Sequence, residues 1–176
     1  MAHFAVTAIG ADRPGIVAAL TGALRDLGGN LEDVSSTILR GHFAMMFVVD
    51  APAEADADAV RAGLEEAAGP LDVQVHVANV EAGVPERPRP THAMTAYGSD
   101  RPGIVAGLAS LLADLGVNIT DLSCRRTAGD APIYAMVAEL AVPAGSDLEG
   151  LEAAVRTAAR ELDVDVSFEA ADVANL

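Results

Sequence analysis

The sequence predicts an α+β fold of two ferredoxin-like βαββαβ domains, each an antiparallel sheet with its helices on one face. First, residues 5–35 return as residues 93–123 without a gap, and 19 of these 31 positions are identical. Second, each copy has hydrophobic patterns in the order strand, helix, strand, strand, helix, strand. Third, a repeat of 88 residues exceeds a solenoid unit and has the size of a small domain. Such a copy typically folds with two helices packed on a four-stranded sheet.

The repeat also predicts the domain limits. We expect domains at 1–80 and 91–176, joined by a linker at 81–90 that is rich in proline (Pro85, Pro88 and Pro90) and therefore rather stiff. The offset between the copies later grows from 88 to 91, which places three extra residues around 128–132. Gly129-Asp130 in that segment predicts a hairpin turn.

In the first copy, the first strand is expected at 4–9 and the first helix from about residue 12. Asp12 is predicted to be the N-cap, with Pro14 in the first turn. Gly28 is suited to the left-handed position after the helix. The helix stripe consists of Ile16, Leu20, Leu24 and Leu27, and in the second copy of Ile104, Leu108, Leu111, Leu112 and Leu115 before Gly116.

The remaining elements follow the same order in both copies. Strands at 31–39 and 42–49 are predicted to form a hairpin across Arg40-Gly41, and 120–126 with 133–142 are its counterpart. A second helix is expected at 55–68, and the last strand at 71–80 alternates with a period of two. The residues behind these predictions are Val60, Leu64, Leu71, Val73, Val75 and Val77, and in the second copy Leu148, Leu151, Val155, Leu162, Val164, Val166 and Phe168.

Composition indicates a globular protein of the cytoplasm. The 176 residues are 51% hydrophobic and 21% charged, which is not typical of a disordered chain. No apolar run approaches the roughly 20 residues of a membrane span, and no signal peptide is recognisable, so we expect no membrane partner. Cys124 is the single cysteine, which fits a reducing compartment.

The formal net charge of −15 argues against direct nucleic-acid binding. Eleven basic residues, all arginine, face 26 acidic ones. Binding to phosphate backbones needs clustered cations on one face, and Arg125-Arg126 and Arg87 with Arg89 are too small for that footprint. We therefore interpret the acidity as a contribution to solubility.

The turn between the first strand and the first helix is the candidate binding site. Gly10 is expected to adopt a backbone angle closed to other residues, and Gly15 to let a ligand approach closely. The helix start offers unpaired N–H groups and partial positive charge to a carboxylate. Asp12 or Asn30 offers a side-chain oxygen to an ammonium or amide. A free amino acid carries both groups.

A purely structural role of this turn is the alternative. Proline and glycine are common turn residues, and Asp12 is a common type of cap. However, residues 12–18 return unchanged as residues 100–106, and a cap and turn do not need the long cations Arg13 and Arg101. Each arginine is also compatible with a solvated side chain or a salt bridge to the acidic surface.

The repeated pattern resembles the ACT domain. Its signature here is a first strand ending in Gly-x-Asp-Arg-Pro-Gly-Ile-Val, a helix closing with Leu-Gly and a strand opening with Asn-hydrophobic. The tandem arrangement, over nearly the whole chain, is similar to the glycine cleavage system transcriptional repressor family of stand-alone double ACT proteins. The motif is fairly specific for ACT but chooses weakly among subfamilies, because uridylyltransferases, phosphoserine phosphatases and formyltetrahydrofolate deformylases also carry tandem ACT units.

This resemblance implies a domain that pairs with another copy, within the chain or in a homodimer, and binds an amino acid at the interface. In the family, ligand contacts come from the first strand–helix loop and the start of the second strand. Beside these positions the copies differ at Ala11 versus Ser99 and Gly29 versus Val117, so the two pockets are expected to differ in affinity, or one to be empty. The implied ligand-binding residues are Gly10, Asp12, Arg13, Pro14, Gly15, Ile16 and Asn30, and Gly98, Asp100, Arg101, Pro102, Gly103, Ile104 and Asn118.

We expect no catalytic residue, metal or cofactor. The four histidines fall on predicted strands or their ends without metal-ligand spacing, and no phosphate loop or catalytic triad order stands out. Arg125-Arg126 would favour a thiolate at Cys124, but Ser36 is its counterpart, so a passive thiol is the interpretation. The histidines are His3, His42, His76 and His92.

The expected function is therefore that of a non-catalytic, amino-acid-binding regulatory protein. Ligand binding would change domain packing and so control a protein partner in amino-acid metabolism of the glycine/serine type, or in its transcription. A stand-alone regulatory subunit of an amino-acid biosynthetic enzyme is the alternative. A small enzyme, the third interpretation, would need a perturbed titrating group in a cleft.

Overall fold

The structure is a computed structural model that describes residues 1–81, 88–127 and 133–171. The chain divides into two compact units, Met1–Pro85 and Glu86–Leu176, and each is considered by itself. The predicted turn at Gly129-Asp130 and part of the predicted linker, with Pro85 and Arg87, lie outside the described residues. The predicted domain limits therefore stay a prediction.

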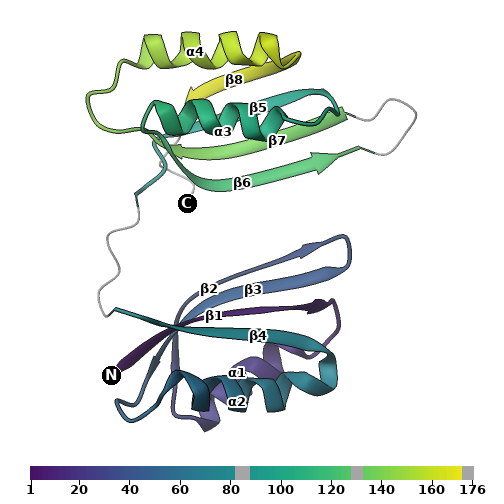
Figure 1. Ribbon diagram of the computed structural model, residues 1–176, viewed down its shortest axis with the longest axis vertical. Coiled ribbons are helices and arrows are strands. Elements are labelled where there is room, and N and C mark those ends of the chain that lie inside the picture. The colour runs from purple at the N-terminus through teal and green to yellow at the C-terminus, as the bar shows by residue number, and fades with distance from the viewer. Residues whose placement is uncertain (82–87, 128–132, 172–176) are drawn as a thin grey trace. The chain divides into compact units, whose positions relative to one another are not determined.

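The first unit has the predicted βαββαβ order. Its sheet has the strand order β2-β3-β1-β4 with antiparallel neighbours, and both helices cover one face of that sheet (Figure 1). A short 3-10 turn, η1 (Gly69–Leu71), leads into the last strand. The elements are β1 (Ala2–Ala11), α1 (Ile16–Asp26), β2 (Asn30–Leu39), β3 (His42–Ala51), α2 (Ala57–Ala68) and β4 (Val73–Val80).

The second unit repeats this architecture, which confirms the predicted fold class. Its sheet order is β6-β7-β5-β8, again antiparallel throughout, with both helices on one face (Figure 1). The elements are β5 (His92–Ser99), α3 (Ile104–Asp114), β6 (Asn118–Arg126), β7 (Ile133–Ala141), α4 (Leu148–Glu161) and β8 (Val164–Ala170).

Each unit buries its own apolar core between sheet and helices. In α1 the stripe residues Ile16, Leu20 and Leu24 are at most 3% exposed, and burial of each such side chain contributes about 1.5–3 kcal/mol. Leu27, predicted for the same stripe, is 36% exposed because it is the C-cap, beyond the last buried turn. Its counterpart Leu115 is 40% exposed for the same reason.

Two predicted turns have the expected conformation. Arg40 and Gly41 both have positive φ, 52° and 81°, as a two-residue type I′ hairpin turn requires. Gly28 has φ 70° and donates its N–H to the Arg25 carbonyl at 3.0 Å. Together with the hydrogen bond from Gly29 to Leu24 (2.8 Å), this is the C-terminal motif in which glycine is favoured.

Among the predicted boundaries that differ from the structure, two were wrong for a local reason. The last strand begins at Val73 and not at residue 71, because Asp72 is left-handed (φ 57°) and ends η1. The second helix begins at Ala57 and not at residue 55, because the side chain of Asp56 caps it by accepting a hydrogen bond from the Ala59 N–H at 2.7 Å. Local capping chemistry, which a hydrophobic pattern does not reveal, sets both limits.

Candidate functional site

The loop between β1 and α1 is fixed to its unit by backbone contacts. Asp12 donates its N–H to the Gly41 carbonyl at 2.8 Å, which ties the loop to the turn between β2 and β3. At Gly10, an added Cβ would lie 2.8 Å from the Asp72 carbonyl oxygen. Gly10 is therefore required by the close approach of the chain entering β4.

The role predicted for Gly10 was wrong, whereas the role predicted for Gly15, to let a ligand approach closely, stays a prediction. Gly10 is not among the described residues with positive φ, whereas Gly15 has φ 100°. A Cβ on Gly15 would meet nothing within 4 Å. The left-handed conformation that disfavours a side chain thus belongs to Gly15, and the crowded backbone belongs to Gly10.

The helix that follows the loop starts without a side-chain cap. Gly15 is the N-cap of α1, with no side-chain hydrogen bond from the described residues. The first intrahelical bond runs from the Ala19 N–H to the Gly15 carbonyl at 2.8 Å. The backbone N–H groups of Ile16, Val17 and Ala18 therefore have no hydrogen-bond acceptor within the helix. The predicted capping role of Asp12 was wrong.

The same open start recurs at α3 in the second unit but not at α2 and α4. Gly103 has φ 101° and caps α3 without a side chain, and Gly107 donates to its carbonyl at 2.8 Å. In contrast, α4 is capped by Asp147, which accepts from the Gly150 N–H at 3.0 Å, as Asp56 caps α2. Aspartate thus caps α2 and α4, the two described α-helices that no copy of the repeated loop precedes.

The charged side chains of the two loops differ in their surroundings. Asp12 and Arg13 are exposed, and across residues 1–81, 88–127 and 133–171 neither forms an ion pair or a side-chain hydrogen bond. In the second unit, the Arg126 Nε lies 2.7 Å from an Asp100 carboxylate oxygen. An Arg101 guanidinium nitrogen lies 2.6 Å from an Asp163 carboxylate oxygen. The predicted salt bridge is therefore present for Arg101.

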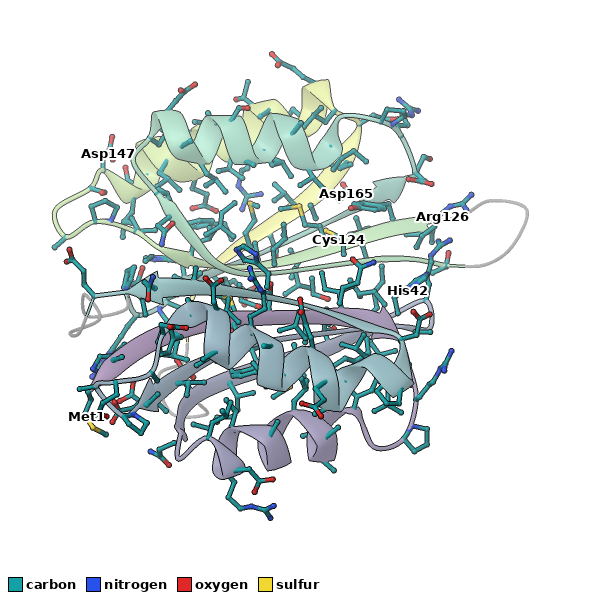
Figure 2. All side chains as sticks on the ribbon, turned by 60° about the horizontal axis from the view of Figure 1, so that its bottom comes forward. Met1, His42, Cys124, Arg126, Asp147 and Asp165 are labelled. Carbon is teal, nitrogen blue, oxygen red and sulfur yellow. The ribbon has the colours of Figure 1, made fainter. Side chains whose placement is uncertain are left out.

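A polar cluster adjoins the second loop. Cys124 and Arg126 both lie along β6 (Figure 2), and Tyr134 on β7 is paired with Arg126 in the sheet register. A hydrogen bond with Cys124, then burial, then the charge of Asp100, raise the pKa of Tyr134 from 10.0 to about 12. Sequence reasoning missed Tyr134 and Asp163, although Asp163 lies in the repeated Leu-Asp-Val that also contains Asp72.

The raised pKa of Tyr134 predicts a pH dependence. The folded protein holds the phenolic proton of Tyr134 more tightly than the unfolded chain does. The contribution of Tyr134 to the free energy of unfolding is therefore fully present below pH 10 and is lost as the pH rises through about 12. A spectrophotometric titration of phenolate absorbance should show a component near pH 12 that Tyr134→Phe removes. Phenylalanine is the equivalent residue, Phe43, in the first unit. If Tyr134→Phe instead removed a phenolate component that titrates at a lower pH, the raised pKa would not belong to Tyr134.

The structure does not bring Asn30 to the loop of its own unit. Asn30 and His3 are both opposite Asp50 in the sheet register, and Gly10 lies seven residues farther along β1. At the rise of a strand, this separation is about 23 Å. Gly29, predicted to lie beside the site, is at the same far end next to Asn30.

The second unit separates its predicted residues in the same way. Asn118 is opposite Ala141, the neighbour of Leu140, which pairs with His92. Gly98 is six residues beyond His92 on β5, which corresponds to about 20 Å. In each unit the residues 10–16 or 98–104 gather at one end of the sheet, and the predicted asparagine lies at the other.

The histidines lie on strands, as predicted. His3 is 3.7 Å from a Glu32 carboxylate oxygen and 4.0 Å from one of Asp50, and His92 stacks on Phe168 at a centroid distance of 5.0 Å. Within the part of the chain that the structure describes, no group of three or more His, Cys, Asp or Glu residues is placed to hold a metal ion. In the same part, every helix is too short or too polar to cross a membrane.

Two hollows of the first unit have none of residues 10–16 in their lining. One, of about 280 Å³, is on the sheet face without helices and includes Thr7, Ile9 and Met46 in its lining. The other, of about 650 Å³, lies along α1 and α2 and includes Gly22 and Gly63. Residues 11–15 are exposed, so the loop is an open surface rather than an enclosed pocket.

Sequence comparison finds one domain family twice in the chain. The family model of the ACT domain matches residues 2–78 and 93–169. A UPF0237 protein of Methanopyrus kandleri is 44% identical over 78 residues, which cover 44% of this chain and 87% of the relative. A UPF0237 protein of Lactococcus lactis is 40% identical over 74 residues, 42% of this chain and 84% of the relative. These relatives therefore correspond to about half of this chain.

Structure comparison finds proteins that match both units. A protein described as "an Unknown Protein from Galdieria sulphuraria" has a TM-score of 0.80 at 25% identity, covering 97% of this chain and 99% of its own. A protein described as "putative glycine cleavage system transcriptional repressor" has a TM-score of 0.75 at 17% identity, covering 97% of this chain and 98% of its own. At that identity, the second match shows a shared fold.

Proposed function

Because this chain belongs to the ACT domain family, we propose that it is a non-catalytic regulatory protein that binds a free amino acid at the loop between first strand and first helix. The observation that carries this proposal is the α-helix start without a side-chain cap, which occurs after both copies of the loop, at α1 and α3, but not at α2 or α4. An aspartate stands three residues before each open start and does not cap it.

The loop offers a partner for each end of a zwitterion. The free N–H groups of Ile16, Val17 and Ala18, together with the partial positive charge of the helix end, suit a carboxylate. Arg13 adds a full positive charge on the same loop, and a hydrogen bond to a charged group contributes about 1.5–3 kcal/mol. Asp12 suits the ammonium group. Both charges are on the surface and make no ion pair with the described residues.

Asn30 belongs to the proposed site only if a second ACT domain takes part. About 23 Å separate Asn30 from Gly10 within one unit, so one small ligand does not contact both. A second domain that presents its asparagine to the exposed loop would complete and cover the site. Ligand binding would then favour the paired state of ACT domains, which is the coupling that regulation needs.

We propose that the regulated partner is a protein in glycine- or serine-type amino-acid metabolism, or in the control of its transcription. The net charge of −15 supports action through a protein rather than through DNA, since phosphate backbones would be repelled. The link to glycine is suggested by the description of one structural neighbour. The link to glycine therefore decides only which ligands are tested first.

Isothermal titration calorimetry tests the proposal. Glycine and serine are titrated first, then the other amino acids, with a thermal-shift assay in parallel, since a ligand that binds the folded state raises the melting temperature. We expect heat and a positive shift for at least one amino acid. Absence of both signals for all twenty would remove the proposed function.

A further inference from the structure

We propose that the two loops are unequal: the first binds the amino acid, and in the second Arg126 occupies the carboxylate that would receive the ligand's ammonium group. This inference rests on the proposed function and adds which site is active. It is carried by the ion pair between Arg126 and Asp100, whose atoms are 2.7 Å apart. The Asp100 side chain is 33% exposed, so its carboxylate is partly shielded as well as neutralised.

The first unit has no equivalent of Arg126. Phe43 and Tyr134 are equivalent, since each is the second residue of its strand, β3 or β7, and precedes Ala-Met. In the sheet register, Ile38 is opposite Phe43, and Arg126 is opposite Tyr134. Ile38 therefore occupies the position of Arg126. An isoleucine forms no ion pair with a carboxylate, and Asp12 accordingly stays without one among the described residues.

The ion pair between Arg101 and Asp163 in the second loop does not explain a difference between the units, because both of its residues have equivalents in the first unit. Arg101 contacts Asp163, and the equivalent residues Arg13 and Asp72 are both present in the first unit. Asp72 and Asp163 share the left-handed conformation, with φ 57° and 54°. The residue that differs is the one at position 38 or 126, so we infer that this position decides which loop is available.

Arg126 weakens binding in two ways. An ammonium group has to displace the guanidinium from Asp100, and an exposed ion pair is worth up to about fivefold in an equilibrium constant. The displaced positive charge then stays near the ammonium and repels it. Together we expect the second loop to bind an amino acid at least about tenfold more weakly than the first.

A reciprocal exchange of the two residues tests the inference. The variants Arg126→Ile, Ile38→Arg and the double exchange are titrated by calorimetry with glycine and with serine. Positions 38 and 126 are 55% and 50% exposed and lie on the edge strands β2 and β6. The exchanges therefore leave both cores intact, and circular dichroism checks the fold.

We expect one site per chain in the unaltered protein, two in Arg126→Ile and none of comparable affinity in Ile38→Arg. The double exchange should restore one site, now sensitive to Arg101→Ala instead of Arg13→Ala. Two equal sites in the unaltered protein would overturn the inference while leaving the proposed function intact. So would binding that Ile38→Arg does not change. Absence of heat in every variant would refute the proposed function itself, and the inference with it.

Discussion

Replacement of Arg13 by alanine is expected to weaken amino-acid binding by about tenfold to a hundredfold, the equivalent of a charge-assisted hydrogen bond of about 1.5–3 kcal/mol. Arg13 is an exposed cation beside an open helix start and has no ion-pair partner in the described parts of the chain. Arg101→Ala is expected to have little effect, because Asp100 of that loop is paired with Arg126 at 2.7 Å, so that the second loop contributes little of the measured binding. Calorimetric titration of each variant measures the difference.

Arg25→Ala is the matched control for Arg13→Ala. Arg25 is in the same unit, is 78% exposed and pairs with Asp26, so its loss changes the net charge equally without touching the loop. A similar loss of affinity in Arg25→Ala would attribute the effect to net charge alone. Asn30→Ala is a further comparison, because it weakens binding only if a second ACT domain brings its asparagine to the loop.

Replacement of Gly10 by alanine is expected to destabilise the first unit by about 1–3 kcal/mol, the range for forcing extra atoms into a packed site. The added Cβ would lie 2.8 Å from the Asp72 carbonyl oxygen and 3.0 Å from a methyl of Val73. The backbone has to shift, because a carbonyl cannot rotate away as a flexible side chain does. Urea unfolding followed by circular dichroism measures the change in the free energy of unfolding.

Gly22→Ala is a control that is expected to raise, rather than lower, the free energy of unfolding. Gly22 lies inside α1, and an added Cβ would meet nothing within 4 Å, so alanine should stabilise the helix by about 0.5–1 kcal/mol. Gly98→Ala should repeat the loss in the second unit, where the Asp163 carbonyl is 2.9 Å from the added atom. A neutral Gly10→Ala would mean that β4 does not enter its sheet so close to Gly10.

Most of the architecture could be predicted because its signals are local. The stripe of Ile16, Leu20 and Leu24 follows the helical period, and these residues are buried as expected. Arg40-Gly41 is a two-residue turn whose residues tolerate the required angles. Each of these signals depends on neighbours a few residues away, so tertiary contacts were not needed to interpret them.

The arrangement of the site depended on contacts between residues distant in sequence. Because α1 returns the chain to the start of β1, β2 begins at the same end as β1, and Asn30 is carried away from the loop. The charge of the second loop is likewise set by Asp163, which directly precedes β8, and by Arg126, which ends β6. No spacing along the chain predicts such pairs.

By itself, the sequence determined that the protein contains one α+β domain twice and that the loop at residues 12–15 recurs at 100–103, because repeats and hydrophobic periods are properties of the chain. Only the tertiary structure decided that Asp12 is not a cap, that Gly10 and Gly15 serve different needs, and that the two loops carry different ion pairs. These features depend on backbone angles and on strand register, which bring together atoms that the order of residues leaves far apart.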